Sequence, residues 1–80
     1  MSKASIVSPL PGTFYRKPSP EEPPYKNVHD KVAEGDVIGL IEVMKSFHEV
    51  KATAAGRISA FLVENEDAVQ AGQALVELAE

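Results

Sequence analysis

The chain repeats itself at a fixed spacing. Shifted by 37 residues, the segment Asp30–Gly35 lies over Asp67–Gly72, and the match continues through Ile38 over Leu75 to Ile41 over Leu78. The spacing of the apolar positions survives the shift. A chain of 80 residues is long enough for one small core only, so the repeat predicts a single domain made of two similar halves.

A second match shows where the two halves differ. Ser8–Gly12 lies over Ala52–Gly56, but this overlay needs a shift of 44, so the first half holds seven more residues than the second. The surplus falls in a segment with four of the six prolines. Because proline removes a ladder donor and fixes φ, we expect this segment, about residues 16–26, to be an ordered loop that projects from the repeat.

Both halves carry short runs of β-branched and aromatic residues bounded by Gly-, Asp- and Pro-containing turns, which is typical of an all-β sandwich or barrel. We expect six strands, at Ser5–Val7, Thr13–Tyr15, Val37–Glu42, Phe47–Lys51, Arg57–Val63 and Ala74–Leu78.

Two segments conflict with this interpretation. Residues 73–80 are rich in Ala, Leu and Glu and favour a helix by propensity. Their repeat equivalent, Val37–Glu42, is β-branched, and because repeats share a structure we expect a strand in both places. The apolar residues Ile58, Phe61 and Val63 break the period of two, which predicts a β-bulge.

Composition narrows the class of function. The net charge is −4 and the eight basic residues are scattered, which disfavours nucleic acid as a partner. Cysteine is absent, which fits a reducing compartment. No leader-like segment opens the chain, and no apolar run reaches the roughly 18 residues that cross a bilayer. We expect a cytoplasmic protein whose partners are proteins, with no membrane contact.

One lysine stands at the midpoint of this pattern. Val37–Val43 and Phe47–Val50 read as the two strands of a hairpin, and Lys45 then lies at its tip. A lysine exposed to water is almost wholly protonated at neutral pH, so another enzyme would have to activate it. A narrow hairpin tip gives such an enzyme access that a flat surface would not. We expect Lys45 to be a modification site.

These residues resemble the biotinyl domain family. Glu42-Val43-Met44-Lys45 is similar to the usual Glu-Ala-Met-Lys-Met motif, with Gly35-Asp36 upstream and Ala55-Gly56 downstream. Segment 8–16 followed by Pro18-Ser19-Pro20 resembles the biotin carriers of multisubunit acetyl-CoA carboxylase, including their protruding "thumb". The resemblance runs from about Ile6 to Leu78. It implies one biotinyl domain over residues 1–80, with the thumb at about 16–26.

The resemblance implies a fold and a function. The fold is a flattened barrel-sandwich of two four-stranded antiparallel sheets with pseudo-two-fold symmetry. Biotin ligase attaches biotin to Lys45, and the carrier moves carboxylate from a biotin carboxylase to a carboxyltransferase during acyl-CoA carboxylation for fatty acid synthesis. The carrier itself catalyses neither reaction, so no catalytic residue is expected. Its contribution is the effective concentration of a tethered group.

The resemblance also assigns neighbouring residues. Met44 belongs to the segment that the ligase recognises, and Glu42 is either part of that segment or a solvated charge on the strand. Val43 replaces the usual Ala, a mild change, whereas Ser46 stands where the family usually has Met and brings ligase efficiency into question. In the thumb, Lys17 occupies the place of a small hydroxyl residue that approaches biotin in the family. Lys17 is therefore a candidate contact, and this departure from the family pattern brings the contact between the thumb and biotin into question.

Other candidate sites are weaker. His29 and His48 have no Cys, His or paired carboxylate at ligand spacing, so we expect no metal site. No phosphate-binding Gly loop, nucleophile elbow or Ser/His/Asp set can be assembled.

Two alternatives remain open. A lipoyl carrier of a 2-oxo acid dehydrogenase shares the fold but typically has Asp where this chain has Met44, which favours biotin. An unmodified barrel that serves as an adaptor would leave Lys45 incidental. Related carriers usually have an N-terminal segment and an Ala/Pro-rich linker, so we expect either an excised domain or a stand-alone carrier.

Overall fold

The computed structural model describes residues 4–79, which form eight β-strands and no helix. No helix in this part of the chain is therefore long and apolar enough to cross a membrane. The strands are β1 (Ala4–Val7), β2 (Gly12–Tyr15), β3 (Lys31–Val32), β4 (Val37–Val43), β5 (Ser46–Lys51), β6 (Gly56–Phe61), β7 (Ala68–Val69) and β8 (Ala74–Ala79).

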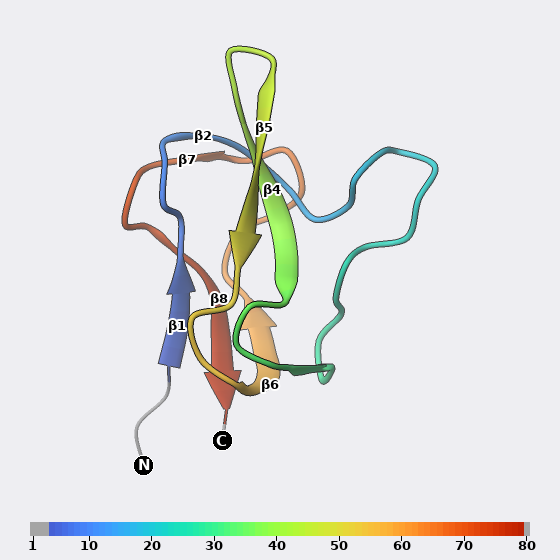
Figure 1. Cartoon of the computed structure of the whole chain (residues 1–80), viewed down its shortest axis with the longest axis vertical. Coiled ribbons are helices and arrows are strands. Elements are labelled where there is room, and N and C mark those ends of the chain that lie inside the picture. Colours follow the sequence, from blue (N-terminus) through green and yellow to red (C-terminus); the bar gives the residue numbers. More distant parts are fainter. Residues whose placement is uncertain (1–3, 80) are drawn as a thin grey trace.

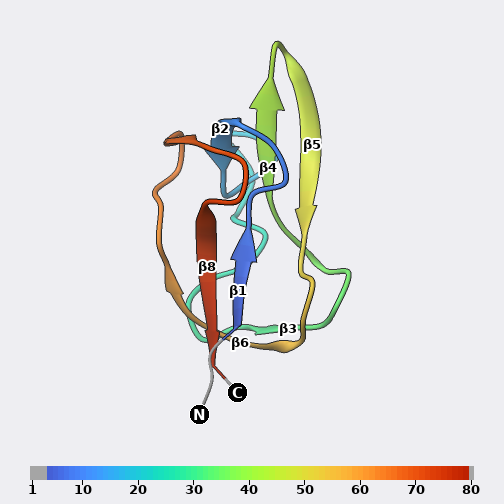
Figure 2. The same cartoon turned by 90° about the vertical axis from the view of Figure 1, so that its left-hand side faces the viewer.

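The strands form two four-stranded antiparallel sheets that face each other (Figures 1 and 2). One sheet has the order β1-β8-β6-β3 and the other the order β5-β4-β2-β7. Each sheet takes strands from both halves of the chain, so neither half could fold without its partner. The predicted barrel-sandwich is confirmed.

Several sequence expectations can be compared with these strands. The region 73–80, which by propensity favours a helix, is strand β8 over its described part. The register of β6 on β8 shifts between Ile58 and Ala60, which confirms the predicted bulge. Strands β3 and β7 were not predicted, because a strand of two residues shows no alternation. The expectation of six strands was wrong for this reason.

The repeat in the sequence is a repeat in hydrogen bonding. The Gly35 N–H donates to the Ala52 carbonyl at 2.8 Å, and the equivalent Gly72 N–H donates to the Ser8 carbonyl at 2.7 Å. Both glycines have positive φ, 95° and 82°. The same turn therefore leads into β4 and into β8, and at each place it ties one half of the chain to the other.

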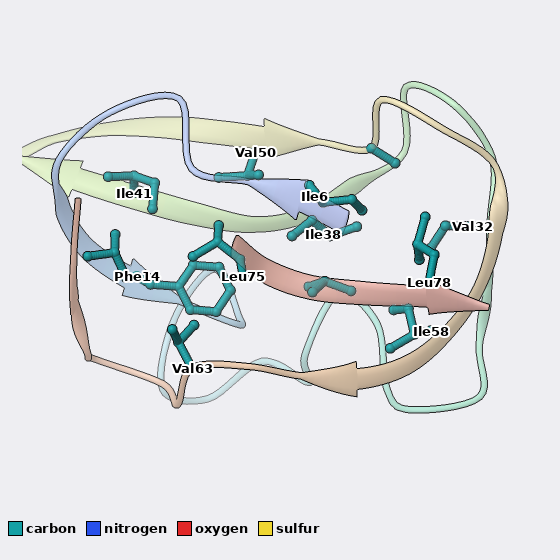
Figure 3. Packing of buried hydrophobic residues seen from close by; sticks show 13 residues of the cluster. Ile6, Phe14, Val32, Ile38, Ile41, Val50, Ile58, Val63, Leu75 and Leu78 are labelled. Atoms are coloured by element: carbon teal, nitrogen blue, oxygen red, sulfur yellow. The ribbon is translucent and has the colours of Figure 1, made fainter. Parts of the chain in front are cut away.

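The core lies between the two sheets (Figure 3) and draws on every strand except the exposed part of the hairpin. Gly39 in β4 allows a close approach, since a Cβ built there would lie 2.5 Å from Cε1 of the buried Phe14. The buried cluster consists of Ile6, Phe14, Val32, Ile38, Ile41, Val50, Ala52, Ile58, Val63, Val69, Leu75, Val76 and Leu78.

Two features project from this barrel (Figure 1). The β4–β5 hairpin extends beyond the other strands at one end, and the segment between β2 and β3, which includes the thumb (residues 16–26), leaves from one side. At the opposite end of the barrel, β1 begins beside the end of β8, with Ala4 opposite Leu78.

Candidate functional site

The tip of the β4–β5 hairpin is a two-residue loop made of Met44 and Lys45. It is closed by the pair Val43 and Ser46, the last residue of β4 and the first of β5. Met44 and Lys45 both have positive φ, 51° and 69°. Two positive φ values are the mark of a type I′ turn, whose twist matches that of the flanking strands. The turn type therefore follows from the hairpin length.

This turn is unusual in its residues. Type I′ turns strongly favour Asn and Gly, whereas here both positions carry long side chains with a Cβ. The left-handed region costs an L-residue other than glycine about 1–2 kcal/mol. The strand pairing on both sides holds Met44 and Lys45 in this conformation. Strain of this kind is concentrated at functional sites, which marks the tip as a candidate functional site.

The side chains at the tip are accessible. Met44 is 93% exposed, and Lys45 and Ser46 are also exposed. Among residues 4–79, Lys45 makes no hydrogen bond and no ion pair that would hold its amine back. Val43 differs, because it is partly buried and packs against the core. Lys45 thus lies on a turn that Val43 fixes to the core, while the turn residues themselves are exposed to solvent.

The root of the hairpin is supported from β2. The Tyr15 hydroxyl donates to Oε1 of Glu42 at 3.0 Å, and its ring lies against Phe47 with the centroids 6.1 Å apart. Glu42 and Phe47 face each other in the β4–β5 ladder. The hydrogen bond to the Glu42 carboxylate, followed by desolvation and by the negative charges of Glu42 and Glu66, raises the pKa of Tyr15 above its usual value.

The thumb is closed at its neck by Arg16. The Arg16 carbonyl accepts from the Tyr25 N–H at 2.9 Å, and Nη2 donates to the Lys26 carbonyl at 3.2 Å, so one residue binds the far end of the loop twice. The Arg16 N–H donates to Oδ1 of Asn65 at 2.8 Å. The guanidinium also lies 4.0 Å from the ring centroid of Phe61, a cation–π contact. The neck is therefore fixed to both sheets.

A hollow of about 420 Å³ lies between the thumb and the barrel. The first thumb residues, 17–20, form one wall, and the rings of Tyr15 and Phe47 form part of the other. Asn65 and Glu66 complete the lining. The hollow combines apolar rings with a lysine and a carboxylate, and apolar walls with a few polar groups are typical of small-molecule sites.

The structure brings together most of the residues expected at the site. Residues 42–46 are consecutive along the hairpin, with Lys45 at the apex. Lys17 lies apart from them on the wall of the hollow, which Lys45 does not line. Tyr15 and Phe47 were missed as parts of the site. The only feature of the sequence that could have indicated Phe47 as part of the site is its position two residues after Lys45.

The histidines lie in separate places. The His29 carbonyl accepts from Nη1 of Arg57 at 2.9 Å, and His48 is on the exposed part of β5. Over residues 4–79 there is no group of three or more His, Cys, Asp or Glu side chains that could hold a metal ion.

Comparisons with a family model and with known proteins all point to biotin-carrying domains. A family model described as "Biotin-requiring enzyme" matches residues 4–78. The biotin carboxyl carrier protein of acetyl-CoA carboxylase from Chlamydia muridarum is 50% identical over 70 residues, which cover 88% of this chain and 43% of that protein. The protein of the same name from a Nostoc species is 36% identical over 75 residues, which cover 94% of this chain and 41% of that one.

The fold is also found in a solved structure. The crystal structure of urea carboxylase from Kluyveromyces lactis superposes with a TM-score of 0.80 at 29% identity, over 99% of this chain and 6% of the carboxylase. The chain spans less than half the length of the carrier proteins that it matches. The family match, which covers the barrel from β1 to β8, shows that the chain belongs to the biotin/lipoyl attachment domain family of biotin-requiring enzymes.

Proposed function

We propose that this chain is the biotin-carrying domain of an acetyl-CoA carboxylase and that biotin is attached to Nζ of Lys45. The observation that carries the proposal is Lys45 itself, which has no hydrogen bond or ion pair within residues 4–79 and lies at the exposed apex of a hairpin whose root is packed against the barrel. Relatives that match nine-tenths of the chain are biotin carboxyl carrier proteins of acetyl-CoA carboxylase. The domain is a carrier and catalyses no step itself.

Attachment requires only access and a free electron pair. Biotin ligase supplies a base and an activated biotin carboxyl group, and Nζ of Lys45 attacks the carboxyl carbon. An amide N–C bond forms while the activating group and a proton leave. The lysine loses its charge, and its four-carbon stem becomes part of a neutral tether. A stiff two-residue turn presents the amine without closing on it, which suits entry into a foreign active site.

The carrier serves two further partners. When bound, biotin supplies a ureido nitrogen that accepts carboxylate at a biotin carboxylase and gives it up at a carboxyltransferase. The chain contributes position, since a tethered group reaches both partners at a high effective concentration. We place this work in the cytoplasm, as part of fatty acid synthesis.

The residues around Lys45 have separate roles in this proposal. Met44 and Ser46 are exposed on either side of the lysine and contact the ligase. Val43 anchors the tip to the core, and Glu42 offers a carboxylate at the root. Lys17 lines the hollow beside Phe47. The hollow is large enough and polar enough to receive the biotin head group, with Lys17 as a donor from the thumb.

Intact mass spectrometry tests the proposal. Co-expression with biotin ligase is expected to add one biotinyl increment, and Lys45→Arg is expected to abolish it. Lys51→Arg is the matched control, because Lys51 is an exposed lysine at the far end of β5, the strand that follows the tip, and should leave the increment intact. A lipoyl increment with lipoate ligase would support the 2-oxo acid dehydrogenase alternative, and no increment under either condition would support the adaptor alternative.

A further inference from the structure

Tyr15 contacts both strands of the hairpin at the same level. Its hydroxyl donates to Oε1 of Glu42 on β4 at 3.0 Å, and its ring packs against Phe47 on β5. Glu42 and Phe47 are directly opposite each other, and Thr13 opposite Glu42 is where β2 stops pairing with β4. Beyond that level only the pair Val43 and Ser46 and the turn remain. Tyr15 therefore acts at the last supported point of the hairpin.

All three side chains lie on the outer face of the sheet. In β2 the buried Phe14 points inward, so its neighbour Tyr15 points outward. In β4 the buried Ile41 points inward, so Glu42 points outward. Phe47 is 58% exposed. The cluster of Tyr15, Glu42 and Phe47 is thus a surface feature that a docking partner meets when it approaches the tip.

Only one of the two Glu42 carboxylate oxygens accepts a hydrogen bond within residues 4–79. Oε1 accepts from Tyr15, while Oε2 has no hydrogen-bond partner among residues 4–79. The hydrogen bond from Tyr15 restricts the side-chain torsions of Glu42 and so orients its second oxygen. Such an oxygen suits an N–H donor or a cationic side chain of a partner, because hydrogen bonds to ionised groups are the stronger ones.

We propose that Tyr15 is a positioning residue for the modification of Lys45. It orients Glu42 so that Oε2 meets a donor of the biotin ligase, and it holds Phe47 as an apolar contact beside that oxygen. This inference rests on the proposed function. The ligase then contacts two side chains that are already in place, Glu42 three residues before Lys45 and Phe47 two residues after it. The phenol of Tyr15 on β2 holds both of them in position.

Ligase kinetics with Tyr15→Phe test the inference. This variant keeps the ring and removes the donor, so the KM of the ligase for the chain should rise about five-fold, the equivalent of one hydrogen bond. The kcat should stay unchanged, because the amine and its turn are untouched. Tyr25→Phe is the matched control and should keep the wild-type KM, since Tyr25 binds the Arg16 carbonyl through its backbone N–H, which the substitution keeps.

A second variant identifies the partner of the phenol. Glu42→Gln should raise KM by itself, and adding Tyr15→Phe should raise it little further, because the two residues act as one unit. Additive effects would overturn the inference. An unchanged KM for Tyr15→Phe, with wild-type biotinylation normal, would overturn it while leaving the proposed function standing. Failure of the wild-type chain to accept biotin would remove both.

The hydrogen bond also has a readout without the ligase. The chain has two tyrosines and no tryptophan, so in a Tyr25→Phe background the ultraviolet titration reports Tyr15 alone. Glu42→Gln should lower the pKa of this phenol toward its usual value, since the carboxylate is the main cause that raises it. If the Tyr25→Phe chain gave the same titration curve with and without Glu42→Gln, the hydrogen bond from Tyr15 to Glu42 would be absent in solution and the inference would be overturned.

Discussion

Asp36 and Gln73 hold the same place in the two halves of the barrel and make the same hydrogen bond. Oδ2 of Asp36 accepts from the Ala33 N–H at 2.9 Å, and Oε1 of Gln73 accepts from the Gln70 N–H at 2.9 Å. Each bond closes the turn that leads into a long strand. One half therefore uses a group that titrates and the other uses a neutral amide.

This difference predicts an acid sensitivity confined to one turn. The hydrogen bond from Ala33 lowers the pKa of Asp36, and Lys26 at 3.4 Å adds to the effect. A pKa that is lower in the folded state stabilises the fold above the unfolded value of about 3.9, and the effect is lost as the pH falls through the folded pKa. Asp36→Asn should lower the urea midpoint at pH 6, and the difference from wild type should shrink at pH 3.

The control for the acid experiment is Glu34→Gln, which removes an exposed carboxylate close to the same turn. The difference in urea midpoint between Glu34→Gln and wild type should not shrink from pH 6 to pH 3 in the way expected for Asp36→Asn. An Asp36→Asn difference that stays constant from pH 6 to pH 3 would contradict the prediction.

The turn at Met44 predicts a stabilising substitution. Met44→Gly removes the left-handed penalty of about 1–2 kcal/mol but gives the unfolded chain about 0.4–1 kcal/mol of extra freedom. Met44→Ala removes the same side chain and keeps the penalty. In urea titrations the Gly variant should exceed the Ala variant by about 0.5–1 kcal/mol of unfolding free energy. Equal stabilities would mean that the positive φ carries no cost.

The same pair of variants separates strain from recognition. If the ligase reads the Met44 side chain, both variants should lose biotinylation rate to a similar degree, whatever their stability. A Gly variant that is modified as fast as wild type would show that the thioether is not read.

Two glycines should respond differently to substitution by alanine. In Gly39→Ala the new Cβ would lie 2.5 Å from Cε1 of Phe14 and 2.8 Å from the Tyr15 carbonyl, so the core must shift. We expect a loss of about 2–3 kcal/mol. In Gly72→Ala no atom of the described residues lies within 4 Å of the new Cβ, and only the φ of 82° is strained, which costs about 1 kcal/mol. Thermal unfolding should rank the two variants in this order, and the reverse order would refute the packing argument.

The neck of the thumb predicts a local effect on hydrogen exchange. Arg16→Lys keeps the charge but loses the planar group that binds the Lys26 carbonyl and stacks on Phe61. The Tyr25 N–H, which is bonded to the Arg16 carbonyl, should then exchange about ten-fold faster, the equivalent of about 1.4 kcal/mol of opening. Lys17→Ala alters the thumb beyond the neck and should leave this rate unchanged. Equal rates in both variants would assign no role to the guanidinium.

Repetition made most of the fold predictable. The helix propensity of residues 73–80 would have misled any local argument, but the overlay on Val37–Glu42 identified a strand correctly. Strands β3 and β7 escaped because two residues cannot show a period, although they lie at equivalent positions of the repeat. Their pairing depends on turns whose geometry is set by the rest of the barrel.

The site was predictable in part. The position of Lys45 between two extended runs gave its place at the tip, but the left-handed backbone of Met44 and Lys45 did not follow, because neither residue favours it. The contact of Tyr15 with Glu42 depends on the register of β2 on β4. Register between strands far apart in sequence is a property of the packed core, so this contact needed the structure.

The two outer ends of the barrel lie at the pole farthest from the tip, with Ala4 beside Leu78. In a longer polypeptide, any tether that continues from either end would hold the molecule by its base. The molecule extends 38 Å along its longest axis, and a flexible Gly-rich segment needs about 40–60 residues to reach a root-mean-square span of that size. The rigid barrel thus adds its own length to the distance that Lys45 can reach from the tether. A longer flexible tether would give the same reach only with additional conformational entropy.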